Sequence, residues 1–180
     1  MAKHGNANKQ GWPRAIKKTI FRRLKEHIEL YTDGAASGNP GPGGYGVVLK
    51  FKQHRKELSK GFRLTTNNRM ELLAVIEGLE SITNTELPVL IYSDSKYVVD
   101  AINLNWIGKW QKTGFAKKAN VDLWLRFLKI YNATKHRFIW VKGHASNVEN
   151  NRCDELAVAA SKMPGQLIDA GYESKENDLF

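Results

Sequence analysis

A glycine-rich run with a strand pattern on both sides constrains the fold most. Residues 39–46, NPGPGGYG, satisfy the pattern G-x-G-x-x-G from Gly41 to Gly46. In a dinucleotide-binding site this motif needs a helix after the glycines, because the helix N-terminus holds the pyrophosphate. Here the preceding residues 28–33 alternate as in a half-buried strand, and the following residues 45–52 are β-branched and aromatic without helical spacing. The run therefore indicates a hairpin connection rather than a dinucleotide site.

The remainder of the chain predicts one more antiparallel strand and then a change of period. Residues 47–64 form two strand patterns around a polar turn near 52–57. From Asn68 the spacing is helical, after a Thr/Asn run that supplies an N-cap, with an apolar face formed by Leu72, Val75, Ile76 and Leu79. The continuous apolar run 87–94 predicts a strand covered on both faces.

The last part of the chain predicts helices around a further strand. Helices are expected at 95–110, 120–131 and 147–163, and a strand at 136–143. Two of these helices have apolar faces, formed by Val121, Trp124, Leu125 and Leu128 and by Cys153, Leu156, Ala157 and Ala160. This order of elements predicts an α/β fold with a mixed sheet covered by helices.

The charge of the chain is concentrated at its beginning. The net charge is +10, and residues 1–27 hold eight Lys or Arg against Glu26 alone, which leaves +7 there. This basic extension precedes a domain at 28–163 and a tail at 164–180. Ile16, Ile20 and Leu24 recur every fourth residue in the extension. It is either a short amphipathic helix that binds nucleic acid, a membrane or an organelle import receptor, or a disordered arm.

Other features indicate a soluble intracellular protein. No apolar run has the length of a membrane span, and the first ten residues lack the apolar core of a secretory signal. A single cysteine, Cys153, excludes an internal disulfide and a multi-cysteine zinc site.

Four acidic residues lie where the predicted fold would bring them together. Asp33 and Asp94 end predicted strands, where open α/β sheets place their sites, and Glu71 and Asp154 adjoin the apolar faces of two helices. Each has an ordinary explanation as a helix-dipole or turn residue. Taken together, carboxylates near apolar faces without matching Lys or Arg favour a metal site. Oxygen ligands without Cys or His select Mg²⁺ or Mn²⁺, and the basic charge suggests metal-assisted phosphoryl chemistry on a polynucleotide.

The motifs that carry these acids resemble one known family. YTDGAASGNPGPGGYG, TTNNRMELLA, SDSKYV, NVDLW and WVKGHASNVENNRCDELA occur in the order and at the spacing of type 1 ribonuclease H, from about Glu29 to Ala160. The resemblance implies a ribonuclease H-like fold, with a five-stranded mixed sheet flanked by helices. It also implies an enzyme that cleaves the RNA strand of an RNA–DNA hybrid with Mg²⁺.

The resemblance assigns roles to individual residues. It implies two Mg²⁺ ions, for which Mn²⁺ could substitute, held by Asp33, Glu71, Asp94 and Asp154, and a histidine that assists proton transfer or product departure, His144. It also implies hybrid contacts from Asn39, Asn67 and Asn68, main-chain contacts to the RNA from Gly34 and Ala36, and a DNA-phosphate site at Thr66 and Asn67. The 2′-hydroxyl distinguishes RNA from DNA, and amide and main-chain groups can bind it.

Residues 105–124 resemble the family's basic protrusion. It would place Trp106, Trp110 and Phe115 among four lysines, Lys109, Lys112, Lys117 and Lys118. The lysines would neutralise DNA phosphates, and the rings would pack on sugar or on one another. Trp110 is equally well explained as a core residue. The sequence departs from the family pattern at Ala35 and Ala36, where Ser and Cys are common, and at Lys96, where Gln frequently contacts the minor groove.

The leading hypothesis is therefore a monomeric, cytoplasmic endonuclease of bacterial type. It would act by two-metal-ion catalysis and leave 5′-phosphate and 3′-hydroxyl ends. The rival hypotheses are a DNA nuclease or transposase of the same superfamily and a module that binds hybrids without cutting them. The complete TTNNRMEL and KGHAS motifs disfavour the first. Four retained carboxylates disfavour the second, since clustered negative charge gives a polyanion binder no advantage.

Overall fold

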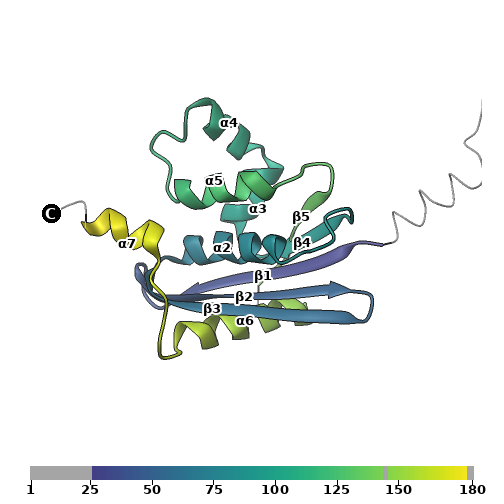
Figure 1. Ribbon diagram of the computed structural model, residues 1–180, viewed down its shortest axis with the longest axis horizontal. Helices are drawn as coiled ribbons and strands as arrows, with labels where there is room; N and C mark the ends of the chain where they lie inside the picture. The colour runs from purple at the N-terminus through teal and green to yellow at the C-terminus, as the bar shows by residue number, and fades with distance from the viewer. Residues whose placement is uncertain (1–25, 144–145, 178–180) are drawn as a thin grey trace, which may run out of the picture.

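The computed structural model describes residues 26–143 and 146–177, which form one mixed sheet with helices on both faces (Figure 1). The strands are β1 (Ile28–Ala36), β2 (Gly41–Phe51), β3 (His54–Thr65), β4 (Val89–Ser93) and β5 (His136–Trp140). Their order across the sheet is β3-β2-β1-β4-β5, with β1–β2–β3 antiparallel and β4 and β5 parallel to β1. The predicted five-stranded mixed sheet is confirmed.

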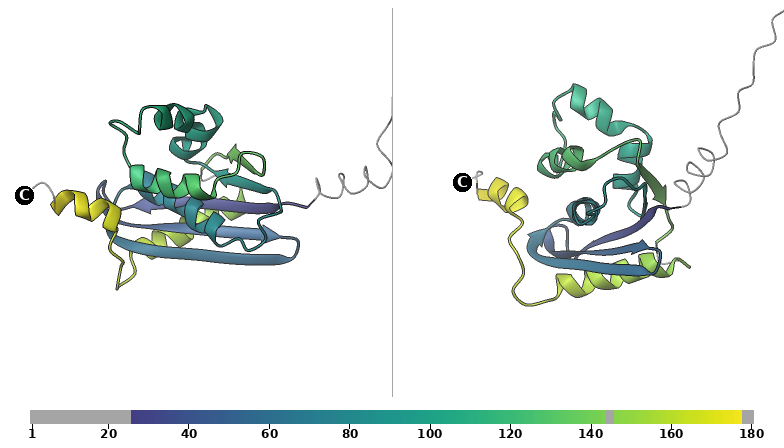
Figure 2. Two further views of the ribbon diagram at one scale, coloured as in Figure 1. Left: turned by 45° about the horizontal axis from the view of Figure 1, so that its top comes forward. Right: turned by 45° about the vertical axis from the view of Figure 1, so that its right-hand side comes forward.

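The helices lie in two layers on the two faces of the sheet. They are α2 (Asn67–Glu80), α3 (Lys96–Asn103), α4 (Trp106–Lys112), α5 (Val121–Ile130), α6 (Val148–Ser161) and α7 (Ala170–Asn177). α6 covers one face of β1, β2 and β3, and α2 to α5 lie over the other (Figure 2). The segment 95–110 is two helices and not one, because Asn105 takes a left-handed φ of 53° that ends the helical path.

The core is centred on α2, whose side chains are buried on nearly every side. The predicted apolar face of Leu72, Val75, Ile76 and Leu79 is fully covered, and α2 packs on β1, β2 and α5. Thr66 is the N-cap residue as predicted, but its side chain makes no capping hydrogen bond.

Two expectations about strand coverage are wrong, for a single reason. β1 is buried on both faces, Tyr31 and Asp33 included, although its alternation predicted a half-buried strand. β4 is fully buried on one face only, because Leu90 and Tyr92 on the other are half-buried. The helix α6 causes both differences, since it lies over β1, β2 and β3.

The predicted face of α5 is also rotated from its expected position. Trp124 is buried, but Leu125 is 47% exposed, and Leu123 and Phe127 complete the buried face instead. Trp124 packs edge-on against both Trp110 and Phe127, and this aromatic cluster sets the orientation of the helix.

The glycine-rich run forms a hairpin, but its glycines belong to β2 rather than to the connection. The connection is 37–40, and Gly44 and Gly46 lie in β2 under α6. A Cβ at Gly46 would lie 2.0 Å from the Cys153 carbonyl oxygen, and one at Gly61 of β3 would lie 2.0 Å from that of Ala160. The glycines therefore let the α6 backbone approach the sheet directly.

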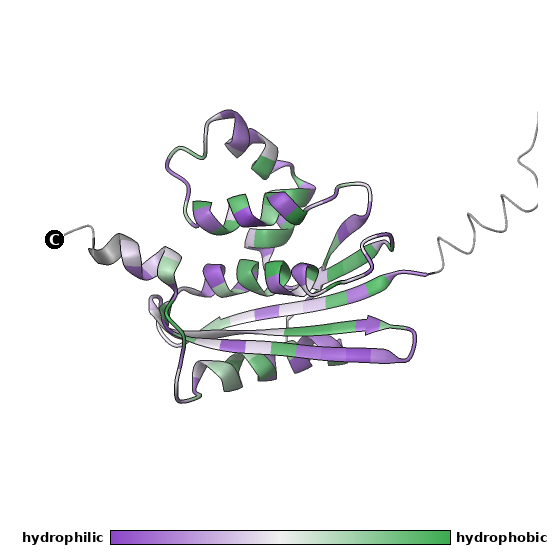
Figure 3. Cartoon of the chain, viewed as in Figure 1, coloured by the Kyte–Doolittle hydropathy of each residue, from purple (hydrophilic) through white to green (hydrophobic). Residues whose placement is uncertain are grey.

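The edge strand β3 has a hydrophilic surface. Much of it is drawn in the hydrophilic colour in Figure 3, and its first residues, His54, Arg55 and Lys56, are exposed. Charged side chains on an edge strand oppose pairing with another sheet. Within the described part of the chain, no helix has the length and apolar character needed to cross a bilayer.

The C-terminal segment is fastened to α2 by a buried ion pair. Arg69, 2% exposed, donates to both carboxylate oxygens of Asp169, at 2.7 Å each, and to both of Asp122, at 2.9 and 2.8 Å. Thr65 also donates to Asp169 at 2.7 Å, and Leu167 pairs with Phe62 at the edge of β3. Residues 164–177, predicted as a tail, are thus joined to the start of α2. The amphipathic stripe predicted at residues 16–24 lies outside the described residues.

Gly46→Ala should destabilise the protein by about 1–3 kcal/mol, because the new methyl group overpacks the contact between β2 and α6. Urea unfolding measures the change. Ser59→Ala, at the exposed partner of Gly46 in β3, is the matched control and should shift stability by less than about 0.5 kcal/mol. Equal stability of the Gly46→Ala variant and the wild type would show that α6 does not need the glycine.

Asp169→Ala should reduce the free energy of unfolding by about 3 kcal/mol, since it leaves half of the buried Arg69 guanidinium without its partner. The control is Glu86→Gln, which removes an exposed partner of Lys135 at 3.3 Å and should have an effect under about 1 kcal/mol. If both variants unfold at the same urea concentration, the C-terminal segment does not anchor α2.

Candidate active site

Three of the four predicted acidic ligands converge in the structure. Asp33 lies in β1, Asp94 follows β4, and Glu71 lies in the second turn of α2. Each offers a carboxylate oxygen, and these oxygens all lie within 4.8 Å of one another. Asp33 and Glu71 are 7% and 6% exposed, so the group is open to solvent mainly on the side of Asp94.

The sheet topology brings these residues together. β1 and β4 are parallel neighbours in which Thr32 pairs with Ser93, so the following residues, Asp33 and Asp94, leave the ladder at the same edge. The start of α2 crosses β1 at Gly34, where a Cβ would lie only 2.2 Å from the Glu71 nitrogen. Glycine at this position allows Glu71 to come within ligand distance of the two aspartates.

Burial and like charge both disfavour ionisation of this group. Burial, followed by the charge of Asp94, raises the pKa of Asp33 to about 8, although a 2.7 Å hydrogen bond from the Gly34 N–H opposes the rise. Burial and the charges of Asp33 and Asp94 also raise the pKa of Glu71 well above its usual range. A cation at the centre of the group would reverse both effects.

The donor set fits a divalent metal ion. The Oε2 atom of Glu71 is buried without a hydrogen-bond partner, and an unpaired buried carboxylate oxygen is costly unless a cation satisfies it. The buried guanidinium on the same helix, Arg69, is occupied by Asp122 and Asp169. Carboxylate oxygens alone suit Mg²⁺ or Mn²⁺ better than zinc.

Asp154 lies beside this group on α6 but is not part of the 4.8 Å cluster found among the described residues. It is half-buried, and its charge contributes to the raised pKa of Asp33. The structure thus places the fourth predicted ligand near Asp33, on the helix that covers the face of the sheet opposite to α2.

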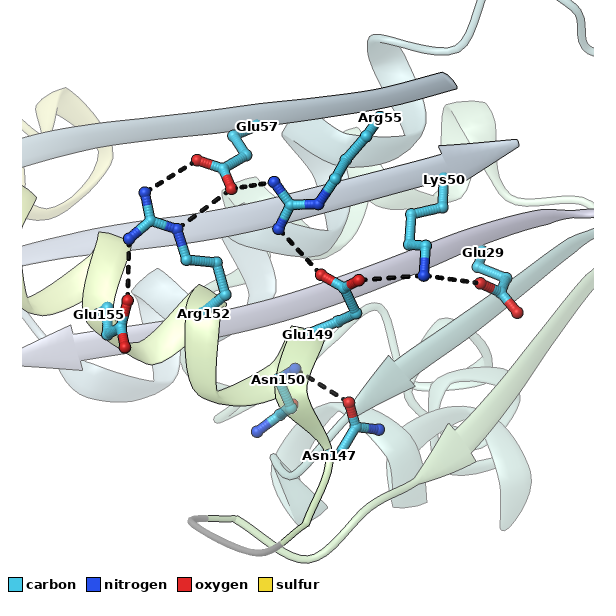
Figure 4. Close-up of polar contacts among 9 residues, drawn as sticks. All are labelled: Glu29, Lys50, Arg55, Glu57, Asn147, Glu149, Asn150, Arg152 and Glu155. Atoms are coloured by element: carbon cyan, nitrogen blue, oxygen red, sulfur yellow. Dashed lines mark hydrogen bonds and ion pairs between the residues drawn. The ribbon is translucent and has the colours of Figure 1, made fainter. Parts of the chain in front are cut away.

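A network of ion pairs holds α6 against the hairpin of β2 and β3 (Figure 4). Arg152 forms a bidentate pair with Glu57 of β3, at 3.1 and 3.0 Å. Glu149 binds Arg55 at 2.9 Å and Lys50 at 3.0 Å. The Asn147 side chain caps the helix by accepting from the Asn150 N–H. Single exposed pairs contribute little, but this network joins β2 and β3 to the helix that carries Asp154.

Several predicted substrate contacts lie at the end of β1, in the hairpin connection and at the start of α2. The Asn39 side chain accepts a hydrogen bond from the Asn67 N–H at 3.2 Å, which joins the hairpin connection to the start of α2. Asn67 and Asn68 are exposed and Thr66 is half-buried, while Gly34 and Ala36 lie in β1. His144 lies outside the described residues.

The predicted protrusion is formed by α4 and the segment after it, and its rings face the protein. Trp106 and Trp110 are half-buried and pack together at 6.4 Å between centroids, and Trp110 packs on the core residue Trp124. Phe115 is 7% exposed, so it packs inside the protein, which is the second of the two possibilities for this ring. The lysines of this region, Lys112 included, are exposed.

Sequence reasoning missed two residues at the site, Gly143 and Trp140. A Cβ at Gly143 would lie 2.3 Å from Asp94 Oδ2, and the Trp140 indole N–H donates to the Asp94 carbonyl at 3.1 Å. Both stand in the quoted motif WVKGH, but nothing in the sequence shows that β5 lies beside β4. Lys96, predicted to bind substrate, begins α3 with its ammonium 5.6 Å from the Trp140 ring centroid.

Known proteins share both the sequence and the fold. The RNase H family model matches residues 25–162. A ribonuclease H from Desulforamulus reducens is 56% identical over 151 residues, which cover 81% of this chain and 94% of that protein. A ribonuclease H from Syntrophus aciditrophicus is 50% identical over 159 residues, which cover 86% and 91%.

Solved structures agree with these matches. LC9-RNase H1, a type 1 RNase H with the type 2 active-site motif, has a TM-score of 0.68 at 30% identity, over 83% of this chain and 80% of that one. LC11-RNase H1, solved in complex with an RNA/DNA hybrid, has a TM-score of 0.54 at 30% identity, over 74% and 95%. The resemblance to type 1 ribonuclease H is confirmed, and the chain belongs to the RNase H family of nucleases.

Proposed function

We propose that this ribonuclease H cleaves the RNA strand of RNA–DNA hybrids with two Mg²⁺ ions, leaving 5′-phosphate and 3′-hydroxyl ends. The observation that carries the proposal is the convergence of Asp33, Glu71 and Asp94 within 4.8 Å. One carboxylate oxygen of this cluster, on Glu71, is buried without a protein partner. LC11-RNase H1, which has the same fold, was solved with an RNA/DNA hybrid.

The residues that would hold the ions are Asp33, Glu71, Asp94 and Asp154. When bound, two ions supply Lewis acidity, which lowers the pKa of the attacking water and stabilises charge on the leaving oxygen. Asp33 and Glu71 are fixed by the packing of β1 against α2 at Gly34. Asp94 is more exposed and therefore faces the substrate. His144 is assigned to proton transfer or product departure.

Hybrid recognition is assigned to the hairpin connection with the start of α2, and to the basic protrusion. Asn39 and Asn67 are held together by the 3.2 Å hydrogen bond and present amide groups at the edge of the cluster. Gly34 and Ala36 supply main-chain groups that can bind the 2′-hydroxyl, which only the RNA strand carries. Exposed lysines on and after α4, with Lys112 at its end, would hold the phosphates of the DNA strand.

Asp94→Asn should reduce cleavage of the hybrid by at least about 10²-fold, because it removes a metal ligand. This loss of activity is larger than the loss expected when a residue that only orients a ligand is replaced. Hybrid binding measured in chelator should stay within about threefold of the wild type. Asp100→Asn, on the neighbouring helix α3, is the matched control and should cleave normally.

The assay uses an end-labelled RNA–DNA hybrid, with RNA–RNA and DNA–DNA duplexes alongside, in Mg²⁺ and in chelator. Loss of the hybrid's RNA strand alone, only with metal, supports the proposal. Binding of the hybrid by folded wild-type protein without cleavage would favour the non-catalytic binding module.

The stability of the metal-free protein should fall as pH rises from about 4 to about 8. Folding raises the pKa of Asp33 from 3.8 to about 8, so in this window the folded state binds a proton that the unfolded chain has released. Thermal unfolding in chelator should show this slope. Mg²⁺ should raise the melting temperature more at pH 8 than at pH 5.

Asp33→Asn should reduce this slope and raise the melting temperature in chelator at pH 8, because the amide keeps the acceptor for the Gly34 N–H without the charge. Glu71, whose pKa burial also raises, should keep part of the slope. Glu86→Gln, at an exposed carboxylate, should keep the wild-type slope. A slope that Asp33→Asn leaves unchanged would mean that other groups cause the pH dependence.

A further inference from the structure

Trp140 is a large aromatic residue that the core does not account for. It ends β5 opposite Ser93 of β4, and its side chain remains 46% exposed. Isolated exposed rings are ordinary, but this one makes two directed contacts, one to Asp94 and one to Lys96, two residues later.

The first contact is a hydrogen bond from the indole N–H to the Asp94 carbonyl, at 3.1 Å. The ladder between β4 and β5 ends with the Val141 N–H bonded to the Ser93 carbonyl, one residue before Asp94. The first turn of α3 bonds to the Ser95 carbonyl instead. The Asp94 carbonyl thus lies between two regular elements, and the indole holds it there.

The second contact is between the face of the ring and the Lys96 ammonium, 5.6 Å from the ring centroid. Lys96 is exposed at the first position of α3, two residues after Asp94. A cation–π contact of this kind restricts a flexible side chain without removing its charge. The ammonium is therefore held over a ring that is itself bonded to Asp94.

The chain that follows Trp140 passes close to the same carboxylate. At Gly143 a Cβ would lie 2.3 Å from Asp94 Oδ2, so the path after β5 limits where the Asp94 side chain can go. Trp140 fixes the start of that path, because its main chain is in the ladder and its ring is tied to Asp94.

We infer that Trp140 is a positioning residue, whose N–H fixes Asp94 for metal binding and whose ring holds Lys96 against a hybrid phosphate. The part of the inference that concerns the hybrid phosphate rests on the proposed function. Its two parts use different atoms of one side chain, so substitutions can separate them.

The test compares Trp140→Phe, Trp140→Leu and Lys96→Gln by three measurements. These are Mg²⁺ binding by calorimetry without substrate, hybrid binding in chelator at several salt concentrations, and the division of cleavage into kcat and KM. Trp140→Phe keeps a ring but loses the N–H. It should weaken Mg²⁺ binding about 10-fold, as loss of an outer-shell partner does, and lower kcat with KM and the salt slope unchanged.

Trp140→Leu loses the ring as well. Trp140→Leu should therefore show the same effects as Trp140→Phe and, in addition, a salt dependence of hybrid binding that is less steep. The slope of log K for the hybrid against log salt should fall in magnitude by about one, the value for one phosphate contact. Lys96→Gln should lower the slope equally while leaving Mg²⁺ binding unchanged. The double variant Trp140→Leu/Lys96→Gln should show no further change in slope.

Trp124→Phe is the control for loss of an indole hydrogen bond. Its N–H donates to the Tyr97 hydroxyl at 2.8 Å in the core, so the variant should lose thermal stability but bind Mg²⁺ as the wild type does. Mg²⁺ binding by Trp140→Phe equal to the wild type would overturn the metal part. A lowered slope in Lys96→Gln but not in Trp140→Leu would overturn the hybrid part.

These results are distinct from failure of the proposed function. Calorimetry on Trp140→Phe compares Mg²⁺ affinity without any substrate, so it tests the metal part even for a wild type that does not cut hybrids. If the wild type cleaves hybrids and Trp140→Phe binds Mg²⁺ and cleaves as the wild type does, the inference is refuted while the proposed function stands.

Discussion

Repulsion among buried carboxylates is the constraint on which the rest of the structure depends. Asp33, Glu71 and Asp94 come within 4.8 Å of one another with two of them almost fully buried, and no protein cation neutralises them among the described residues. Such a group opposes folding when it is ionised. The remaining contacts must therefore hold β1, β4 and α2 together against this repulsion, and they do so by close backbone packing and a buried core.

The packing is closest where the site is built. Glycine at position 34 lets α2 contact β1, and the glycines of β2 and β3 let α6 contact the other face. A Cβ would lie 2.2 Å from the α2 backbone at Gly34 and 2.0 Å from the α6 backbone at Gly46. Larger residues would therefore push each helix away from the sheet, and the acidic residues that these helices carry would move with them. A divalent ion held at this site would bind only the folded state. It would therefore raise the free energy of unfolding and offset the repulsion among the carboxylates.

The sequence predicts the parts of this arrangement that depend on local pattern. Period and turn chemistry were enough for the hairpin, the order of the elements and the helical face of α2. Position at predicted strand ends singled out Asp33 and Asp94 before any family was considered, although β1 continues past Asp33 to Ala36, paired with β2. The coverage of β1 and β4 was mispredicted because it depends on where α6 docks, which no local period records. The partners of Arg69 and the contacts of Trp140 join residues far apart in the chain, so only the tertiary structure reveals them. Gly44 and Gly46 of β2 are likewise explained by the close approach of α6, which follows them by more than a hundred residues.

The position of Arg69 shows how a strong cation can lie near the site without disabling it. Arg69 and Glu71 are two positions apart on α2, and residues at i and i+2 of a helix point in different directions. The guanidinium is therefore turned toward Asp122 and Asp169, whose four carboxylate oxygens accept its hydrogen bonds. An arginine one turn from Glu71, at i+4, could have paired with it and removed the cost of its burial. That pairing would also have occupied the oxygen that a metal ion needs. The helix thus gains a buried ion pair on one side, while the carboxylate on its other side stays available for a ligand.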